Sequence, residues 1–323
     1  MKVLLAGGSG MVGTAVLAVL RERGHEPRLL VRRSAGDGEV GWDPACGELP
    51  SEAVAWADAV VSLNGASLTR LPWTRGYRRE ILGSRVAATA LIAKSIAATT
   101  GDRSPASGEP GRGRGAGDDE SSQIPEDGVG PKVWVSASAV GIYGSRPGET
   151  LTEDSPRGAG FLADVVAAWE EAAAPASAAT RVVLARTGVV LGPGGALMPL
   201  TRLARCGLGG RVGSGRQHWP WISLTDEARA IVHLLEASTL AGPVNLVAPT
   251  PATAIDVTRA VARALRRPHV VPAPAWALRA ALGDAARDLL LADQFVVPAR
   301  LSGDGFEFAH TDLVAAVAAG VAC

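Results

Sequence analysis

The chain has 323 residues, 47% hydrophobic and 20% charged, a balance typical of one large α/β domain or two closely joined units. Its 32 basic and 32 acidic residues cancel, which argues against a protein that coats nucleic acid. The three cysteines lie far apart without metal-ligand spacing, so neither a zinc site nor a disulfide framework is expected. With no signal-peptide pattern and no uninterrupted apolar run of membrane-spanning length, we expect a cytoplasmic protein that has no membrane partner.

The first thirteen residues predict a strand, a turn and the start of a helix. Lys2 to Ala6 is an apolar run typical of a strand buried on both faces, and a helical pattern begins at Met11. The glycines between them fit a phosphate-binding turn, which needs a tight bend, a close backbone approach to a pyrophosphate and free helix amides. An ordinary tight turn is the alternative. The residues expected to contact a dinucleotide here are Gly7, Ser9, Gly10, Met11, Val12 and Gly13.

The end of the second expected strand, Pro27 to Val31, indicates which dinucleotide binds. Enzymes that use NAD place an acidic residue about 20 positions past the glycines, whereas arginine there accommodates the 2′-phosphate of NADP. Arg32 and Arg33 stand nineteen and twenty residues after Gly13, and no acidic residue follows the strand before Asp37. The pattern favours NADP as the cofactor. Two solvated arginines that open a loop are the alternative.

Strands and helices alternate along the next two hundred residues, which predicts a parallel sheet with right-handed crossovers. Ligands of such sheets bind at the carboxyl ends of the strands, where Gly7, Arg32, Leu63, Ser138 and Arg186 fall. Asn64-Gly65-Ala66 closes the third strand and is expected beside the first turn. Further strands are expected at 59–63, 132–138, 181–185 and 244–247, and helices at 14–23, 75–99, 163–174 and 225–238.

The predicted fold is a doubly wound Rossmann-type α/β sheet with a smaller α-rich unit on the substrate side. Residues 1–245 form the expected NADP-binding domain, and residues 246–323 the α-rich unit, with helices at 254–265 and 276–292 and a short last one. Within the first domain, residues 101–131 are rich in Gly, Pro, Ser, Asp and Arg and predict a disordered surface insertion. Residues 192–222 are expected to form a loop on the substrate side.

Several motifs together resemble the atypical extended short-chain dehydrogenase/reductases of the epimerase-like family, within the NAD(P)-dependent epimerase/dehydratase superfamily. The resemblance runs nearly end to end apart from the insertion, and implies an NADP-binding Rossmann domain followed by a carboxy-terminal domain of unassigned function. The motifs are Gly7-Gly-Ser-Gly-Met-Val-Gly13, Trp42-Asp-Pro44, Leu82-Gly-Ser-Arg85, Ser136-Ala-Ser-Ala-Val-Gly141, Gly160-Phe-Leu162, Trp169-Glu170, Arg186-Thr-Gly-Val-Val-Leu-Gly192 and Gly213-Ser-Gly-Arg-Gln217. The cofactor contacts that it implies are Val31, Arg32, Leu63, Asn64, Glu80, Arg85 and Val190. Alanine often occupies the place of Asn64 in this group, which favours a contact through its backbone.

The catalytic signature of typical short-chain dehydrogenases is absent. They place Tyr and Lys four apart on a helix, where the ammonium lowers the pKa of the phenol so that it exchanges a proton. Neither of the two tyrosines, Tyr77 and Tyr143, is followed four residues later by a lysine. On the helix where the pair belongs, Leu162 and Val166 occupy the two places.

Substitute catalytic groups are available near the expected cleft. Ser138 stands at the strand end where a serine assists that tyrosine, and Tyr143, five residues later, is expected at the rim of the cleft. Packing with a solvated hydroxyl is the alternative role for a tyrosine at a rim. His218 follows the glycine-rich loop and either acts on a substrate or has a structural role. Trp219 and Trp221 are expected in the core or an interface, with stacking on a flat substrate as the alternative.

The sequence therefore predicts an NADP-binding, short-chain-dehydrogenase-like protein, either an oxidoreductase or an epimerase-type enzyme on a small-molecule substrate. The alternative is a non-catalytic NADP-binding sensor or scaffold protein, which the missing Tyr and Lys favour. The sequence leaves the substrate and the oligomeric state open.

Overall fold

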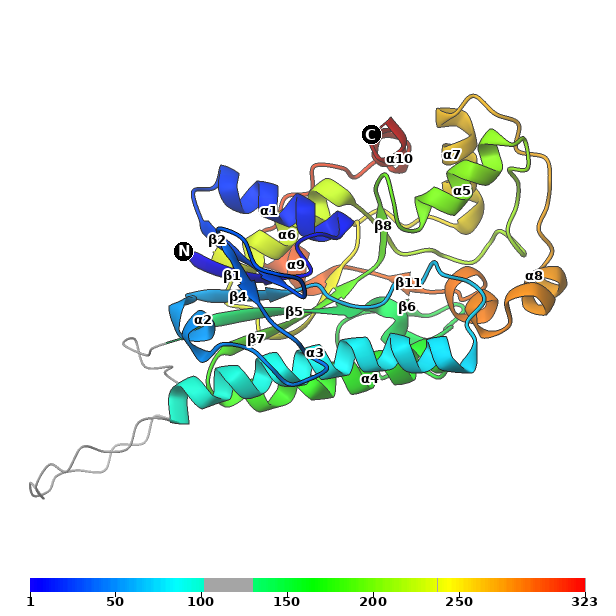
Figure 1. Ribbon diagram of the computed structural model, residues 1–323. Coiled ribbons are helices and arrows are strands. Elements are labelled where there is room, and N and C mark those ends of the chain that lie inside the picture. The colour runs from blue at the N-terminus through cyan, green and yellow to red at the C-terminus, as the bar shows by residue number, and fades with distance from the viewer. Residues whose placement is uncertain (102–129, 237, 323) are drawn as a thin grey trace, which may run out of the picture.

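The computed structural model describes residues 1–101, 130–236 and 238–322, and its centre is a seven-stranded, fully parallel sheet (Figure 1). The strand order is β10-β7-β5-β4-β1-β2-β3, so that the chain winds outward in both directions from β1 and β4. This confirms the predicted doubly wound Rossmann-type sheet. The strands are β1 (Lys2–Ala6), β2 (Glu26–Val31), β3 (Glu39–Gly41), β4 (Ala59–Ser62), β5 (Val133–Ala139), β7 (Arg181–Thr187) and β10 (Gly242–Leu246).

The central strands are buried because helices cover both faces of the sheet. In β1 the residues Val3 and Leu5 face one hydrophobic cluster with Val16 and Leu20 of α1 (Met11–Glu22), and α6 (Leu224–Glu236) completes that layer. The alternate residues of β1 face the opposite cluster, which draws on three helices. These helices are α2 (Ser51–Trp56), α3 (Arg75–Gly101) and α4 (Phe161–Ala173), and Figure 1 shows α3 and α4 side by side along that face. A strand covered on both sides carries a continuous run of apolar residues, as Val3 to Ala6 of β1 do.

The helix α3 is, by length and composition, the one described helix that is able to cross a membrane, over residues Arg75–Thr99. Gly83, Arg85 and Lys94 interrupt this stretch, so the expectation that no uninterrupted apolar run has membrane-spanning length is not contradicted. In the structure α3 packs along α4, and its Ile81, Ile92 and Ile96 are fully buried. A helix that is apolar and packed in this way is a core helix of the domain.

A second core lies beyond the carboxyl ends of the strands. It joins Leu191, Leu197, Trp221 and Val261 among others, and thus combines residues near 190–220 with the carboxy-terminal helices. The elements of this region are β8 (Val189–Leu191), α5 (Leu197–Arg205), β9 (Trp221–Ser223), α7 (Ala254–Ala264), α8 (Ala275–Leu282), α9 (Ala299–Gly303) and α10 (Leu313–Ala322), and a two-stranded pair, β6 (Thr150–Leu151) with β11 (Phe295–Val296), lies beside them.

Two expectations for this region are wrong. Residues 192–222 are not only a loop, because they include α5, whose Leu197 is buried in the second core. The helix expected over 276–292 is broken, because Gly283 ends α8 with a φ of +55° and a separate turn of helix, Ala286–Leu290, follows. The division of the chain at residue 245 stays a prediction. Most of the predicted insertion at 101–131 lies outside the described residues, because the structure does not describe residues 102 to 129.

Candidate functional site

The glycine turn after β1 is packed so tightly that a side chain on either of two of its glycines would displace neighbouring backbone. Gly7 has a φ of +83°, and a Cβ atom on it would lie 2.8 Å from the carbonyl carbon of Leu63 in the loop after β4. A Cβ atom on Gly13 would lie 2.1 Å from the Gly7 oxygen. Glycine therefore brings β1, α1 and the loop after β4 together, as the fingerprint requires.

The first turn of α1 presents unused hydrogen-bond donors at this point. Gly10 precedes the helix without a side chain to cap it, and its own amide donates to Gly7. Within the described residues, the amides of Ser9, Met11 and Val12 have no acceptor. Unpaired amides at a helix N-terminus attract anions, and no side chain at Gly10 blocks the approach. The turn therefore fits the pyrophosphate of a dinucleotide.

The structure separates the two arginines that follow β2. Arg33 forms a bidentate ion pair with Glu39, at 2.6 and 2.7 Å, and this hydrogen bonding raises the pKa of Arg33 and lowers that of Glu39. Arg32 is exposed next to Val31 and has neither a hydrogen bond nor an ion pair with any described residue. Only Arg32 is free to bind a phosphate without first breaking a pair.

Helix α3 places a partly buried cation against the loop after β4. Arg85 of α3 donates hydrogen bonds to the backbone oxygens of Ile81 and Ala66, and its guanidinium lies 5.1 Å from the ring centre of Trp169. No carboxylate among the described residues pairs with it, and burial lowers the pKa of Arg85 to about 10. Its guanidinium lies against Gly65, where a Cβ atom would come within 3.0 Å of Cζ. A positive charge without a counter-ion thus lies beside the loop that touches the glycine turn.

The other residues predicted to contact the cofactor differ in their burial and in their distance from the glycine turn. The side-chain oxygen of Asn64 is buried and has no hydrogen-bond partner among the described residues. Met11 reaches the loop after β8, where a Cβ atom on Gly192 would lie 2.8 Å from its sulfur, and this brings Val190 of β8 toward the glycine turn. The side chain of Glu80 is 56% exposed and lies 4.0 Å from Arg70, and its contact with the cofactor stays a prediction.

Ser138 is part of a buried polar network and does not face open space. Its hydroxyl donates to Glu170 of α4 at 2.5 Å, and Arg186 of β7 forms a bidentate ion pair with the same carboxylate at 2.8 and 2.9 Å. Ser138 is 3% exposed. The positions where a catalytic Tyr and Lys are expected hold Leu162 and Val166, both buried. No free proton donor therefore lies at the place usual for short-chain dehydrogenases.

Tyr143 is fully buried, so its predicted place at the rim of a cleft is wrong. It ends the 3₁₀-helix Val140–Tyr143, which folds inward after β5. Its hydroxyl donates to the side-chain oxygen of Asn245 at 2.7 Å and accepts from Arg186 at 3.0 Å. Burial raises the pKa of the phenol, although the charge of Arg186 opposes that shift. Tyr143 therefore satisfies a buried network in the core.

We expect Tyr143→Phe to reduce stability and to leave cofactor binding unchanged. Removal of the hydroxyl leaves the Asn245 oxygen without that donor, which costs about 1–3 kcal/mol for a buried group. Denaturant unfolding measures the loss, and calorimetry with NADPH measures the affinity. A variant of wild-type stability with weakened NADPH binding would contradict this role.

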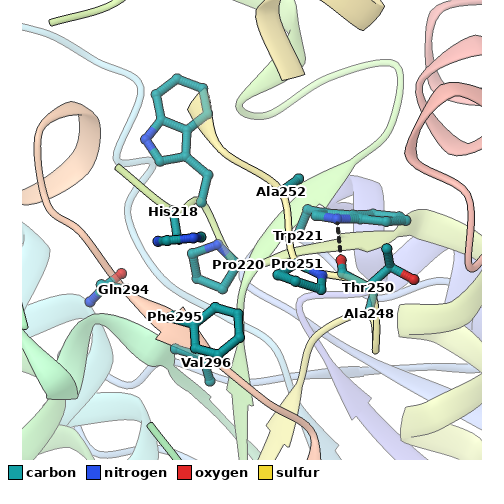
Figure 2. Close-up of a pocket in the computed structure, with 11 residues that line it drawn as sticks. His218, Pro220, Trp221, Ala248, Thr250, Pro251, Ala252, Gln294, Phe295 and Val296 are labelled. Atoms are coloured by element: carbon teal, nitrogen blue, oxygen red, sulfur yellow. Dashed lines mark hydrogen bonds between the residues drawn. The ribbon is translucent and has the colours of Figure 1, made fainter. Parts of the chain in front are cut away.

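A small hollow, with space for about one water molecule, lies at the carboxyl end of the sheet near β10 (Figure 2). One wall is the segment that enters β9, a second follows β10, and the third is β11 with the residue before it. His218 faces this hollow, and its Nδ1 lies 2.8 Å from Oδ1 of Asp293. Trp219 and Trp221 are buried, which confirms their expected role in the core. The lining residues are His218, Trp219, Pro220, Trp221, Ala248, Thr250, Pro251, Ala252, Gln294, Phe295 and Val296.

Comparison with known proteins places this geometry in a family. The model of the NAD dependent epimerase/dehydratase family matches residues 3–248. The chain belongs to this family. A second model, described as a domain of unknown function (DUF1731), matches residues 273–319, and together the two confirm the resemblance that the motifs carry. Among the described residues, no group of three or more His, Cys, Asp or Glu side chains is arranged to hold a metal ion.

Relatives match this member of the epimerase/dehydratase family over nearly their whole length. An epimerase family protein of Mycobacterium leprae is 36% identical over 314 residues, which cover 96% of this chain and 92% of the relative. The crystal structure of the human epimerase family protein SDR39U1 with NADPH has a TM-score of 0.82 at 34% identity, and covers 100% of this chain and 99% of that one. The UDP-glucose 4-epimerase of Thermus thermophilus in complex with NAD has a TM-score of 0.71 at 19% identity, over 100% and 98% of the chains, which shows the fold alone.

Sequence reasoning missed the partners of several site residues. The ion pair of Glu170 with Arg186 was not predicted, although both residues stand in motifs and Glu170 follows Val166 by one helical turn. The pairing of His218 with Asp293 carried no signal, because 75 residues separate them. In both cases the fold brings together residues that no local pattern connects.

Proposed function

We propose that the chain binds NADP(H) and acts as an oxidoreductase on a small molecule. The proposal rests on two sets of groups that have no hydrogen-bond or ion-pair partner among the described residues. They are the amides of Met11 and Val12 in the first turn of α1, and the guanidinium of Arg32 directly after β2. The amides would hold the pyrophosphate, and Arg32 the 2′-phosphate. Bound NADPH supplies a hydride, and the chain supplies its orientation. The human relative, whose crystal structure is described as containing NADPH, supports the same cofactor.

Calorimetry with NADPH and NADH on Arg32→Ala and Arg33→Ala tests the cofactor. We expect Arg32→Ala to weaken NADPH binding by about 10- to 100-fold, the value of a charge-assisted hydrogen bond, and to leave NADH binding nearly unchanged. Arg33→Ala is the matched control, because Arg33 is already paired with Glu39. It should change the affinity for NADPH by less than about threefold.

Two results would contradict the proposal. Equal affinities of the wild-type protein for NADPH and NADH would show that no group selects the 2′-phosphate. An equal loss in both variants would show that the pair with Glu39 does not distinguish the two arginines.

A non-catalytic NADP(H) sensor is the second candidate, and the buried network favours it. Ser138 is engaged by Glu170, and Leu162 and Val166 fill the places of a catalytic pair, so no proton donor of the usual kind is available. The two candidates differ in whether NADPH is consumed. Loss of NADPH absorbance with any carbonyl substrate favours the oxidoreductase, and bound NADPH that stays unoxidised across a broad panel favours the sensor.

A further inference from the structure

We infer that the protein docks peripherally on membranes of anionic lipid, through a surface of exposed apolar and arginine side chains near its second core. This docking surface joins the end of α5 and the loop after it to the segment between α7 and α8. Figure 1 shows these three helices together at one end of the molecule. The apolar residues of the docking surface are Leu203, Leu208, Val270, Val271 and Trp276.

Backbone hydrogen bonds hold the two segments of the docking surface side by side. The amides of Val270 and Val271 both donate to the oxygen of Gly209, at 2.9 and 3.0 Å. Leu208, the neighbour of Gly209, donates through its amide to the oxygen of Leu203 in the last turn of α5, at 2.9 Å. The exposed side chains of the two segments are therefore parts of one surface.

The docking surface holds most of the large hydrophobic side chains that are exposed in the described part of the chain. Val270 is 72% exposed and Trp276 is 75% exposed. Trp276 lies in the first turn of α8, and Leu278, two residues later and thus on the opposite side of the helix, packs against the second core. Trp276 therefore points away from the core. Apolar side chains gathered on an exposed surface in this way mark an interaction site.

The charge of the docking surface is positive throughout. Residues 197–216 and 257–283, which contain it, include no aspartate or glutamate. Acidic and basic residues balance over the whole chain, so this excess of positive charge is local. The arginines of the docking surface are exposed, and none of them has an ion pair with a described residue. They are Arg202, Arg205, Arg211, Arg266, Arg267 and Arg279.

This combination of side chains matches the surface of an anionic bilayer. The phosphate groups of the lipids attract arginines, while apolar side chains enter the boundary between the headgroups and the acyl chains. Tryptophan is enriched at that boundary because its ring has an apolar body and a polar N–H group. A contact of this kind needs no membrane-spanning helix, and it replaces the expectation that the protein has no membrane partner.

Two other occupants fit the docking surface less well. A second copy of the chain, related by two-fold symmetry, would place this surface against itself, so that arginines of both copies would face one another without acidic partners. A nucleic acid would pair with the arginines and stack on Trp276, but it offers nothing apolar to cover Leu208 and Val270. A lipid surface supplies anionic groups and an apolar layer together.

Flotation of the full-length protein with vesicles tests the inference. The vesicles contain phosphatidylcholine alone, or phosphatidylcholine with about one third phosphatidylglycerol as the anionic lipid. Trp276→Ser removes the exposed ring, and the double variant Arg266→Gln/Arg267→Gln removes two positive charges. Trp276 is the one exposed tryptophan among the described residues, so the tryptophan emission spectrum reports whether its ring enters lipid.

Matched control variants change the same kinds of side chain outside the docking surface. Leu71→Ser replaces an apolar residue that is 41% exposed. Arg75→Gln/Arg79→Gln removes two exposed arginines of α3 that have no ion pair with a described residue. Each control therefore matches one docking-surface variant in hydrophobicity or in charge.

We expect the wild type to bind the anionic vesicles and not those of phosphatidylcholine alone, with binding that weakens as salt rises. Trp276→Ser should weaken this binding by about 10-fold or more. Arg266→Gln/Arg267→Gln should weaken it by about 25-fold, because each arginine near an anionic surface contributes about fivefold. The controls should bind as the wild type does. Tryptophan emission should move to shorter wavelength on the anionic vesicles in the wild type and stay unchanged in Trp276→Ser.

The inference is overturned if the anionic vesicles leave the wild type unbound, or if the controls lose as much binding as the docking-surface variants. Unchanged tryptophan emission of the bound wild type would equally contradict it. A dimer in sedimentation that Trp276→Ser dissociates would show that the surface joins two copies and would also overturn it. Calorimetry with NADPH tests the proposed function separately, because no residue assigned to the cofactor belongs to the docking surface.

Discussion

Gly13→Ala is expected to reduce NADPH binding by at least about 100-fold, a loss of roughly 2.7 kcal/mol. The added Cβ atom would lie 2.1 Å from the Gly7 oxygen and 2.8 Å from the Gly8 Cα, both backbone atoms that no rotamer change moves aside. To remove this steric clash, α1 must shift away from the turn, and the amides of its first turn move with it. The same overpacking should cost about 1–3 kcal/mol of unfolding free energy.

Gly83→Ala is the matched control for that variant. Gly83 lies within α3, and no atom is found within 4 Å of a Cβ built on it. Alanine there should raise stability by about 0.5–1 kcal/mol through its better helix propensity and leave NADPH affinity unchanged. Calorimetry and denaturant unfolding of the two variants together separate crowding at the turn from a general effect of Gly→Ala. Wild-type NADPH affinity in Gly13→Ala would show that the turn does not hold the cofactor.

The sheet was predictable because each of its central strands carries a local signal. Strands covered on both faces are apolar along nearly their whole length, and β1 from Val3 and β4 up to Val61 show this in the sequence. The short strands gave no such signal. Glu39–Gly41, which pairs with β2 at the edge of the sheet, is partly exposed and contains no run of apolar residues. Its pairing is set by the neighbouring strand and not by its own sequence.

The cofactor side of the site was readable from the sequence, and the catalytic side was not. Glycine spacing and the arginines after β2 act through the local backbone, so their positions follow from the chain order. The side chains of Tyr143 and His218 are hydrogen-bonded to Asn245 and Asp293, each more than 70 residues away in sequence, so no local pattern predicts their surroundings. The ion pair of Arg33 with Glu39 could not be predicted either, although the two residues are close in sequence. It forms only once β3 lies beside β2.

Glu227→Gln is expected to make the protein much more stable at pH 8 and to change little at pH 4.5. Glu227 lies in the first turn of α6 and is 1% exposed. Thr187 donates to one carboxyl oxygen at 2.7 Å, and the other oxygen is buried without a partner. Burial raises the pKa of this carboxyl from 4.5 to about 8, although the hydrogen bond from Thr187 opposes the shift.

The sign of the pH dependence follows from proton binding. Between pH 4.5 and about 8 the native state keeps a proton on Glu227 that the unfolded chain has lost. Stability therefore falls as pH rises through this window, by about 1.4 kcal/mol for each pH unit. The stabilising effect of the neutral carboxyl is complete below pH 4.5, and the accumulated loss near pH 8 is on the order of 5 kcal/mol. Glutamine keeps the oxygen that accepts from Thr187 and carries no charge to bury, so it avoids this loss.

Denaturant unfolding of the wild type, Glu227→Gln and Glu171→Gln from pH 4.5 to 8.5 measures the effect. Glu171 is an exposed glutamate of α4 and serves as the control for loss of one negative charge. All other titrating groups contribute equally to the wild type and the variant, so the difference between their curves isolates Glu227. That difference should widen steadily with pH for Glu227→Gln and stay flat for Glu171→Gln. Parallel curves for all three proteins would show that the buried carboxyl is already ionised at neutral pH, which requires a counter-charge that the described residues do not provide beside it.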